Sequence, residues 1–302
     1  MEGFFKNTKL AAGLSVVSNL TLIILKLVAG FISGSISIIS EAIHSGSDFL
    51  ASVIAFYAVH KSDQPADEGH QFGHGKYEDV AGFVEGCLII LASLYIIYEA
   101  SKKLSGLSEP IDNSVLAVSV MFVSVCANTL VSAYLIKVAK ITDSIAIYSD
   151  AQHLRTDIYS SLAVFIGLVV INITNCHILD PLIALVVAII IMNTGVKICK
   201  RTMNDILDGS LPESDIELIR STIKTNSQET ALAIKEIKTR KAGKDKEIVI
   251  ILCVDGNLTV QYTHNLCDKL EHEIEKQLGN TKITIHVEPE TPDNIPCQNI
   301  VK

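Results

Sequence analysis

The sequence of 302 residues lacks several patterns by which common classes of protein are identified. It contains no tryptophan, no Cys-x-x-Cys pair, no HExxH motif and no GxxxxGK[ST] loop. Its seven cysteines are scattered, which argues against a disulfide framework and a thiolate zinc knuckle and indicates mostly reduced packing residues. The missing phosphate-binding loop argues against ATP-driven chemistry. Without HExxH, an intramembrane zinc protease is also disfavoured, because such an enzyme needs a general base beside an open metal position.

Positive charge is also in short supply. The chain has 25 Lys and Arg residues against 33 Asp and Glu residues, which gives a net charge of −8 and a pI near 5.6. We therefore expect no basic surface and no nucleic-acid partner, and the acidic balance favours cations near the protein.

Apolar residues, in contrast, are abundant. They make up 49% of the chain, and the mean hydropathy of +0.39 is too high for an ordinary soluble domain of this size. Windows of about 20 apolar residues indicate membrane-spanning helices. Six such windows occur, at residues 10–31, 38–59, 80–100, 115–138, 145–171 and 179–198. The sequence thus predicts an all-α membrane bundle of six transmembrane helices. Lys26 interrupts the first window, which is also too long for a cleavable signal peptide. It is expected to snorkel or to neutralise a carboxylate inside the bundle.

The loops between these windows predict an orientation, because lysine and arginine concentrate in cytoplasmic loops. With six spans, nearly all short-loop cations fall on one side, and Lys102 and Lys103 are the exceptions. The protein is therefore expected in the cell (inner) membrane, multi-pass, with both termini and the C-terminal domain cytoplasmic. The cations on that side are Lys6, Lys9, Lys61, Lys76, Lys137, Lys140, Lys197, Lys200 and Arg201.

Two predicted spans carry the same pair of ionisable residues. His44 and Asp48 lie four residues apart in the second span, and His153 and Asp157 repeat this spacing in the fifth. On a helix this spacing puts both side chains on one face. Ionisable groups at membrane depth are costly and therefore indicate function. A lone histidine would more often be a structural hydrogen-bonding residue, but two facing pairs supply the four ligands of a tetrahedral ion such as zinc.

The loop DQPADEGHQFGHGKYED, at residues 63–79, suggests a second metal site. Asp67, His70 and His74 offer oxygen and nitrogen ligands three and four residues apart. Glycines at 69, 73 and 75 let the backbone fold tightly around an ion. The alternative is a solvated polar loop in which His74 and Lys76 contact lipid headgroups.

Beyond Arg201 the composition becomes that of a soluble domain. We expect a helix after Pro212, strands at 231–240 and 247–254 joined by a turn at 241–246, a helix at 259–278 and a strand at 282–288. This order predicts a small α+β sheet with two helices on one face. The predicted domains are residues 1–208 in the membrane and 209–290 in the cytoplasm, followed by a disordered tail at 291–302. A core of about 85 residues is modest, so dimerisation would help to stabilise it.

These residues together resemble the cation diffusion facilitator family over nearly the whole chain. The resemblance implies a six-helix transport domain, a cytoplasmic ferredoxin-like domain, a homodimer, and export of divalent metal from the cytoplasm in exchange for protons. PADEGHQFGHGKYE matches the family's most recognisable signature. Lys76 and Asp208 resemble the pair that ties the dimer together. By the same resemblance the transport site is His44, Asp48, His153 and Asp157, and the loop site is Asp67, His70 and His74.

The resemblance is weaker in the cytoplasmic domain. His264, His286 and Glu288 match ligand positions of members that bind two zinc ions there, but Lys235 and Ile251 stand where the histidines of the early strands are expected. We therefore expect a reduced metal site or none, with surface histidines as the alternative.

The ligand set also bears on the metal and the mechanism. Two imidazoles and two carboxylates favour zinc as the transported ion, while cadmium, cobalt, nickel, ferrous iron and manganese stay open. No organic cofactor is expected. Metal binds deprotonated ligands, so protons compete with it, and an imidazole with an unperturbed pKa of about 6.5 makes this competition effective near neutral pH. We expect a transporter with alternating access rather than an enzyme. A metal sensor that binds ions without moving them is the main alternative.

Overall fold

The computed structural model describes residues 7–33, 36–105, 115–174, 179–226 and 233–290. The expected tail at 291–302 lies outside these residues. The chain forms two compact units, Met1–Met203 and Asn204–Lys302, which are described separately.

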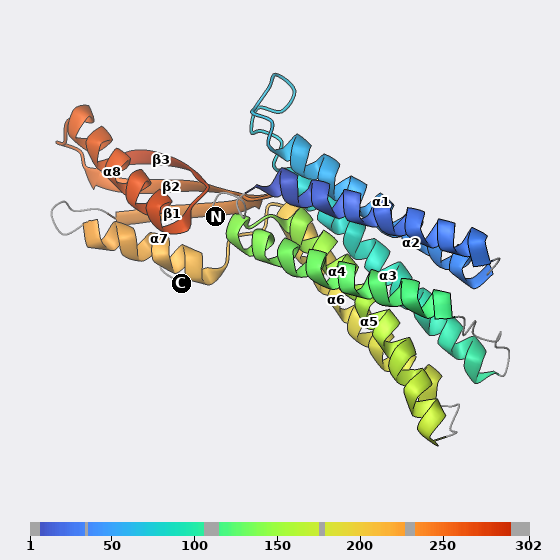
Figure 1. Ribbon diagram of the computed structural model, residues 1–302. Coiled ribbons are helices and arrows are strands. Elements are labelled where there is room, and N and C mark those ends of the chain that lie inside the picture. The colour runs from blue at the N-terminus through green and yellow to red at the C-terminus, as the bar shows by residue number, and fades with distance from the viewer. Residues whose placement is uncertain (1–6, 34–35, 106–114, 175–178, 227–232, 291–302) are drawn as a thin grey trace. The chain divides into compact units, whose positions relative to one another are not determined.

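The first unit consists of long helices that coincide with the six predicted apolar windows (Figure 1). A helix is thus confirmed at each of the six windows, whereas the prediction that all six span the membrane stays a prediction. Within the described ranges, three of them contain a stretch long and apolar enough to cross a membrane, at Thr8–Ala29, Lys76–Lys102 and Phe122–Thr142. The helices are α1 (Thr8–Ser33), α2 (Ile36–Ser62), α3 (Lys76–Leu104), α4 (Val115–Thr142), α5 (Ile145–Thr174) and α6 (Leu179–Ile206).

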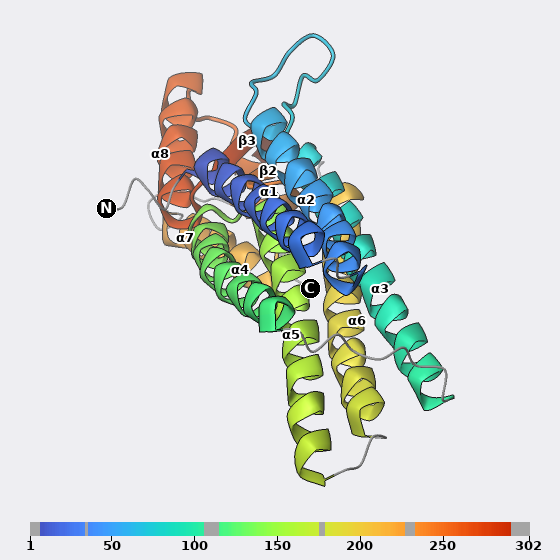
Figure 2. The same ribbon diagram turned by 45° about the vertical axis from the view of Figure 1, so that its right-hand side comes forward.

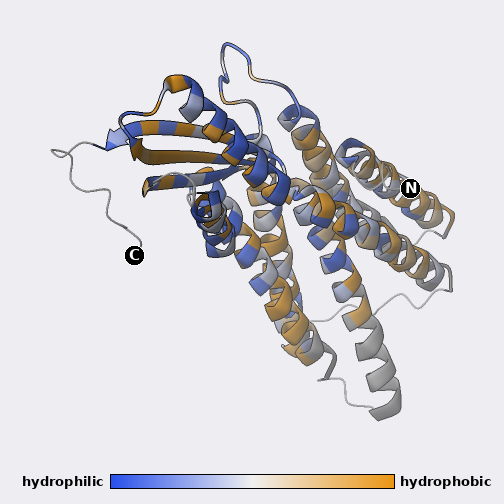
Figure 3. Ribbon diagram, turned by 90° about the vertical axis from the view of Figure 1, so that its left-hand side faces the viewer, coloured by the Kyte–Doolittle hydropathy of each residue, from blue (hydrophilic) through white to orange (hydrophobic). Residues whose placement is uncertain are grey.

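Small residues hold these helices together. Helix α1 packs against α2 and α4, and α5 packs against α3 and α4 (Figure 2). Alanines 11, 12, 58, 146 and 151 lie in the shared core, where small side chains let helix backbones approach closely. Large apolar side chains such as Phe31, Phe122 and Leu130 point outward and are largely exposed. Figure 3 shows the resulting apolar colouring along these helices. An apolar exterior around a small-residue interior suits a bilayer.

The second unit is a three-stranded sheet with two helices. Its elements are α7 (Glu213–Asn226), β1 (Ala233–Ala242), β2 (Asp245–Asp255), α8 (Val260–Leu278) and β3 (Thr281–Glu290). The order in the sheet is β1-β2-β3, with β1 and β2 antiparallel and β2 and β3 parallel. The predicted order of helices and strands is confirmed. Residues from both helices and β2 form one core: Ile219, Ile223, Ile248, Ile250, Leu252, Leu270 and Ile274.

The predicted turn at 241–246 is wrong in length. Strand β1 continues to Ala242 and β2 begins at Asp245, so only two residues connect them. Gly243 has a φ of 61°, a left-handed conformation that glycine adopts readily and that two-residue hairpins require. The polar run on either side therefore belongs to the strands, with Lys241 opposite Lys246.

Candidate metal centres

Three of the four residues predicted for the transport site meet inside the helical unit. The ligand atoms of Asp48, His153 and Asp157 all lie within 4.8 Å of one another. His153 Nε2 is 3.3 Å from Asp48 Oδ1, and both side chains are buried. The side chain of His44, the fourth predicted ligand, lies outside the described residues. Its helix, α2, is the one that supplies Asp48.

A cavity opens at this cluster. It has a volume of about 250 Å³ and is lined by Asp48, His153 and Asp157 together with apolar and aromatic residues of α3: Leu88, Leu91, Ala92 and Tyr95. His153 Nδ1 makes no hydrogen bond to any described residue. Carboxylate oxygens and an imidazole nitrogen that converge on a largely apolar cavity form a donor set suited to a divalent transition-metal ion.

Polar contacts between α1 and α2 support this cluster. Asn19 Nδ2 donates a hydrogen bond to the carbonyl oxygen of Asp48 at 3.4 Å. Lys26 Nζ donates to Ser45 Oγ at 2.6 Å, one turn before Asp48. Lys26 is only 5% exposed, so of its two expected roles snorkelling is excluded. These contacts fix α2, and with it Asp48, against α1.

The loop between α2 and α3 gathers the second predicted set. The ligand atoms of Asp67, His70 and His74 lie within 4.8 Å of one another. Asp67 Oδ2 is 3.3 Å from His74 Nε2, and the two imidazole ring centroids are 4.5 Å apart. Asp67 and His70 are exposed, whereas His74 is buried. Gly73, with a φ of 91°, provides the backbone turn that brings His74 back towards Asp67.

Backbone N–H groups stabilise the ionised form of the Asp67 carboxylate. Its Oδ1 accepts hydrogen bonds from the backbone N–H groups of His70 at 2.7 Å and Gly69 at 3.0 Å. The His70 N–H is the main reason that the pKa of Asp67 lies below its ordinary value, and the nearby His74 adds to this effect. The carboxylate is thus ionised at neutral pH and free of proton competition.

The three residues predicted for a cytoplasmic-domain site do not gather. Among the described residues, the ligand atoms of His264, His286 and Glu288 do not form one cluster, although His286 Nε2 lies 3.9 Å from Glu288 Oε1 on the same strand. His264 Nδ1 lies 3.6 Å from Asp268 Oδ1 on α8. Glu288 on β3 forms an ion pair with Lys235 Nζ at 2.5 Å. An ammonium group bound to Glu288 competes with any metal there.

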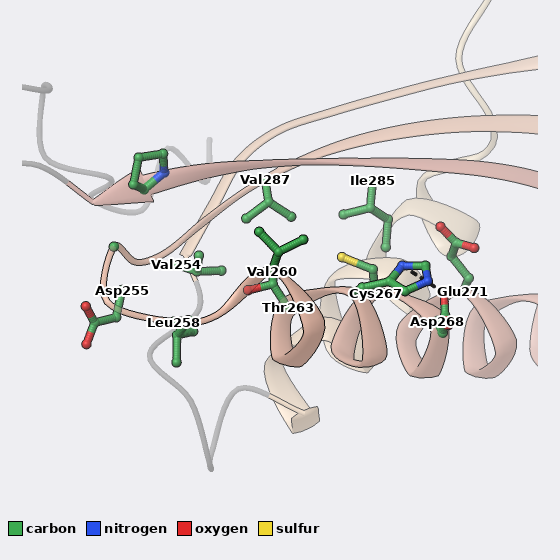
Figure 4. Close-up of a pocket in the computed structure, with 13 residues that line it drawn as sticks. Val254, Asp255, Leu258, Val260, Thr263, Cys267, Asp268, Glu271, Ile285 and Val287 are labelled. Carbon is green, nitrogen blue, oxygen red and sulfur yellow. Dashed lines mark ion pairs between the residues drawn. The ribbon is translucent and has the colours of Figure 1, made fainter.

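A cavity of about 480 Å³ separates α8 from β3 in this unit (Figure 4). His264, Cys267, Asp268 and Glu271 line it from α8, and Ile285 from β3. Burial raises the pKa of the Cys267 thiol, and the carboxylates of Glu271 and Asp268 raise it further. Among the described residues, the side chains that line this cavity do not form a cluster of three metal ligands.

The two residues of the expected dimer pair lie in different units. Lys76 is the first residue of α3 in the helical unit. Asp208 forms an ion pair with Arg240 of its own unit, at 3.2 Å. Their pairing across a dimer stays a prediction.

Sequence reasoning assigned no function to two buried carboxylates near the transport cluster. Glu85 on α3 and Asp150 on α5 are both fully buried. Both are acidic residues within predicted apolar windows, and this placement alone indicates a functional role. Their proximity depends on how α3 packs against α5, which one sequence does not reveal.

Each of the two units matches a known protein family. Residues 13–207 match the cation efflux transmembrane domain, and residues 211–290 match the cytoplasmic domain of cation efflux proteins. Long helices that enclose carboxylate and imidazole ligands, followed by an α+β dimerisation domain, define a membrane transporter of metal cations. The chain belongs to the cation efflux family, also called the cation diffusion facilitators. This is a family of transporters, so the protein is a multi-pass membrane transporter and not an enzyme.

Individual relatives extend over nearly the same length. The uncharacterized transporter sll1263 of Synechocystis is 32% identical over 94% of this chain and 94% of its own. The manganese efflux system protein MneP of Bacillus subtilis is 28% identical over 91% of this chain and 94% of its own. A cadmium, cobalt and zinc/H(+)-K(+) antiporter of the same organism is 26% identical, over 91% of this chain and 88% of its own. Named relatives thus differ in the metals that they carry.

Proposed function

We propose that this cation efflux protein exports zinc from the cytoplasm in exchange for protons, through a site formed by His44, Asp48, His153 and Asp157. The observation that carries the proposal is the cluster of Asp48, His153 and Asp157 at a cavity lined by α2, α3 and α5, in which Asp48 and His153 are buried. Buried carboxylates and an imidazole are expensive in an apolar bundle unless a cation or proton compensates them.

Zinc is favoured by the donor set. With His44 the site offers two imidazole nitrogens and two carboxylate oxygens, and imidazole suits zinc better than manganese. The name of one relative includes zinc, together with cadmium and cobalt, which supports zinc as the transported ion. Another relative is named for manganese, so manganese is the main alternative ion.

Proton exchange follows from the same ligands. Imidazole and carboxylate bind metal only when deprotonated, so protonation from the far side of the membrane expels the ion and metal binding on the cytoplasmic side expels protons. The name of one relative includes H(+) antiport, which supports the coupling.

The arrangement in the membrane belongs to the same proposal. Helix α2 has 27 residues, and at 1.5 Å per residue it reaches about 40 Å, longer than a bilayer core of about 30 Å. Its ligand residues lower its hydropathy without shortening it. We propose that all six helices span the membrane, that both termini are cytoplasmic, and that the C-terminal unit is a ferredoxin-like domain that pairs two chains into a homodimer.

The direct test is zinc binding and zinc flux in one set of variants. Asp157→Asn preserves size and removes one charge from the cluster, so it should lower flux into proteoliposomes at least tenfold while the protein elutes as the same oligomer. Asp143→Asn, at an exposed residue paired with Arg201, is the matched control. Full flux in Asp157→Asn would refute the proposed site, and tight binding without any flux would favour a metal sensor.

A further inference from the structure

Two carboxylates lie close to the proposed transport site without taking part in it. Glu85 and Asp150 are 0% exposed. Asp150 precedes His153 by three residues on α5, so it lies about one helical turn away on the same side of that helix. Helices α3 and α5, which carry the two carboxylates, pack against each other, and the carboxylates are close enough to repel electrostatically.

Close packing of α3 on α5 creates this arrangement. At Gly82 of α3, an added Cβ would lie 3.1 Å from Ser149 Oγ and 3.4 Å from Ile145 Cγ1. Glu85 follows Gly82 by three residues, on the same face of α3. The glycine therefore lets Ser149 and Asp150 approach the turn that carries Glu85.

Hydrogen-bond donors for the carboxylates of this cluster are not found within the part of the chain that the structure describes. Among the described residues, none is found for either carboxylate oxygen of Glu85 or Asp150, nor for the hydroxyls of Ser15 and Ser149. Ser15, on α1, is close enough to interact with Asp150 without forming a well-aligned bond. Both serines are fully buried as well. Buried oxygens without donors carry a large desolvation cost, which a bound cation would offset.

We propose that Glu85, Asp150, Ser15 and Ser149 form a second cation site, built only of oxygen ligands, that holds a divalent metal ion one helical turn from the transport site. Two carboxylates match the charge of a dication. An all-oxygen set prefers hard ions such as Mn²⁺ and holds zinc more weakly than a site with imidazoles. Given the proposed transport function, an ion here would pass on to the tighter site rather than be trapped.

Metal binding can be measured without transport. In detergent-solubilised full-length protein, Asp67→Asn, Asp157→Asn and His286→Ala together disable the other candidate sites. We expect this background to bind one Mn²⁺ per chain, counted by electron paramagnetic resonance, and to lose it when Glu85→Gln or Asp150→Asn is added. Glu217→Gln, at an exposed residue of α7, should leave binding intact.

The environment of the bound ion provides a second readout that needs no change in the cluster. Pulsed electron paramagnetic resonance of Mn²⁺ in the background variant should show no ¹⁴N modulation, because every ligand is oxygen. Histidine modulation, no bound Mn²⁺, or binding that survives both Glu85→Gln and Asp150→Asn would overturn the second site. None of these results depends on flux, so the proposed transport function can fail or stand separately.

Discussion

At the scale of single residues, the proposed transport site makes a prediction about which ion is accepted. Asp48, His153 and Asp157 come from two helices whose spacing of charged residues is visible in the sequence, and their ligand atoms meet within 4.8 Å. A single exchange of nitrogen for oxygen at this site should change selectivity before it changes the fold, because the cavity beside it tolerates small differences in size.

His44→Asp tests this point. Replacing imidazole with carboxylate leaves one nitrogen and three carboxylates, a set that suits manganese better than the natural one. We expect the ratio of zinc flux to manganese flux in proteoliposomes to fall by about tenfold, which is about 1.4 kcal/mol of selectivity. His60→Asp, at an exposed histidine of the same helix, is the control. An unchanged ratio would remove His44 from the site.

The loop site gives a prediction about pH. Because backbone N–H groups keep the pKa of Asp67 below its ordinary value, this carboxylate is ionised throughout the range from about pH 6 to pH 8. Zinc affinity of the loop should fall with decreasing pH because protons compete with the metal for its ligands. Asp67→Asn should lower that affinity by a similar factor at every pH in the range. Calorimetry in the Asp157→Asn background measures it, and a factor that varies strongly with pH would contradict a permanently ionised Asp67.

At the scale of elements, much of this architecture could be predicted. Long apolar windows predicted α1 to α6, and the strand expected at residues 247–254 corresponds to β2. The hairpin is shorter than the sequence predicts because its strand ends are polar, and polar runs are typical of loops. The pairing of Glu85 with Asp150 was missed for another reason, since it depends on the contact of α3 with α5 at Gly82.

Close helix contacts also make a prediction about stability. An added Cβ at Gly195 of α6 would lie 2.8 Å from Ile90 Cγ1 and 3.0 Å from the carbonyl oxygen of Gly86, which is backbone and cannot turn aside. Gly195→Ala should therefore push α6 from α3 and destabilise the protein by about 1–3 kcal/mol. At Gly13 the nearest atom would lie at an ordinary 3.6 Å. Thermal unfolding in detergent should separate Gly195→Ala from Gly13→Ala, and equal melting temperatures would disprove close packing.

At the scale of the whole molecule, the two units divide the work. The helical unit contains both clusters of three carboxylate and imidazole ligands that are found among the described residues. The C-terminal unit has its own apolar core. Its Glu288 forms an ion pair with Lys235, and no cluster of three ligands is found among the described residues of this unit. We therefore expect the C-terminal unit to pair two chains and the helical unit to transport the metal.

Proton-driven zinc transport through this site is tested most directly by measuring zinc and proton movement in the same proteoliposomes. Proteoliposomes with an acidic lumen would carry one dye for zinc and one for pH. On addition of external zinc, the natural sequence should show zinc entering and luminal pH rising at proportional rates, and Asp157→Asn should show neither beyond the leak of empty liposomes. Zinc that enters at the same rate without a pH gradient, or in Asp157→Asn, would contradict proton-driven transport through this site.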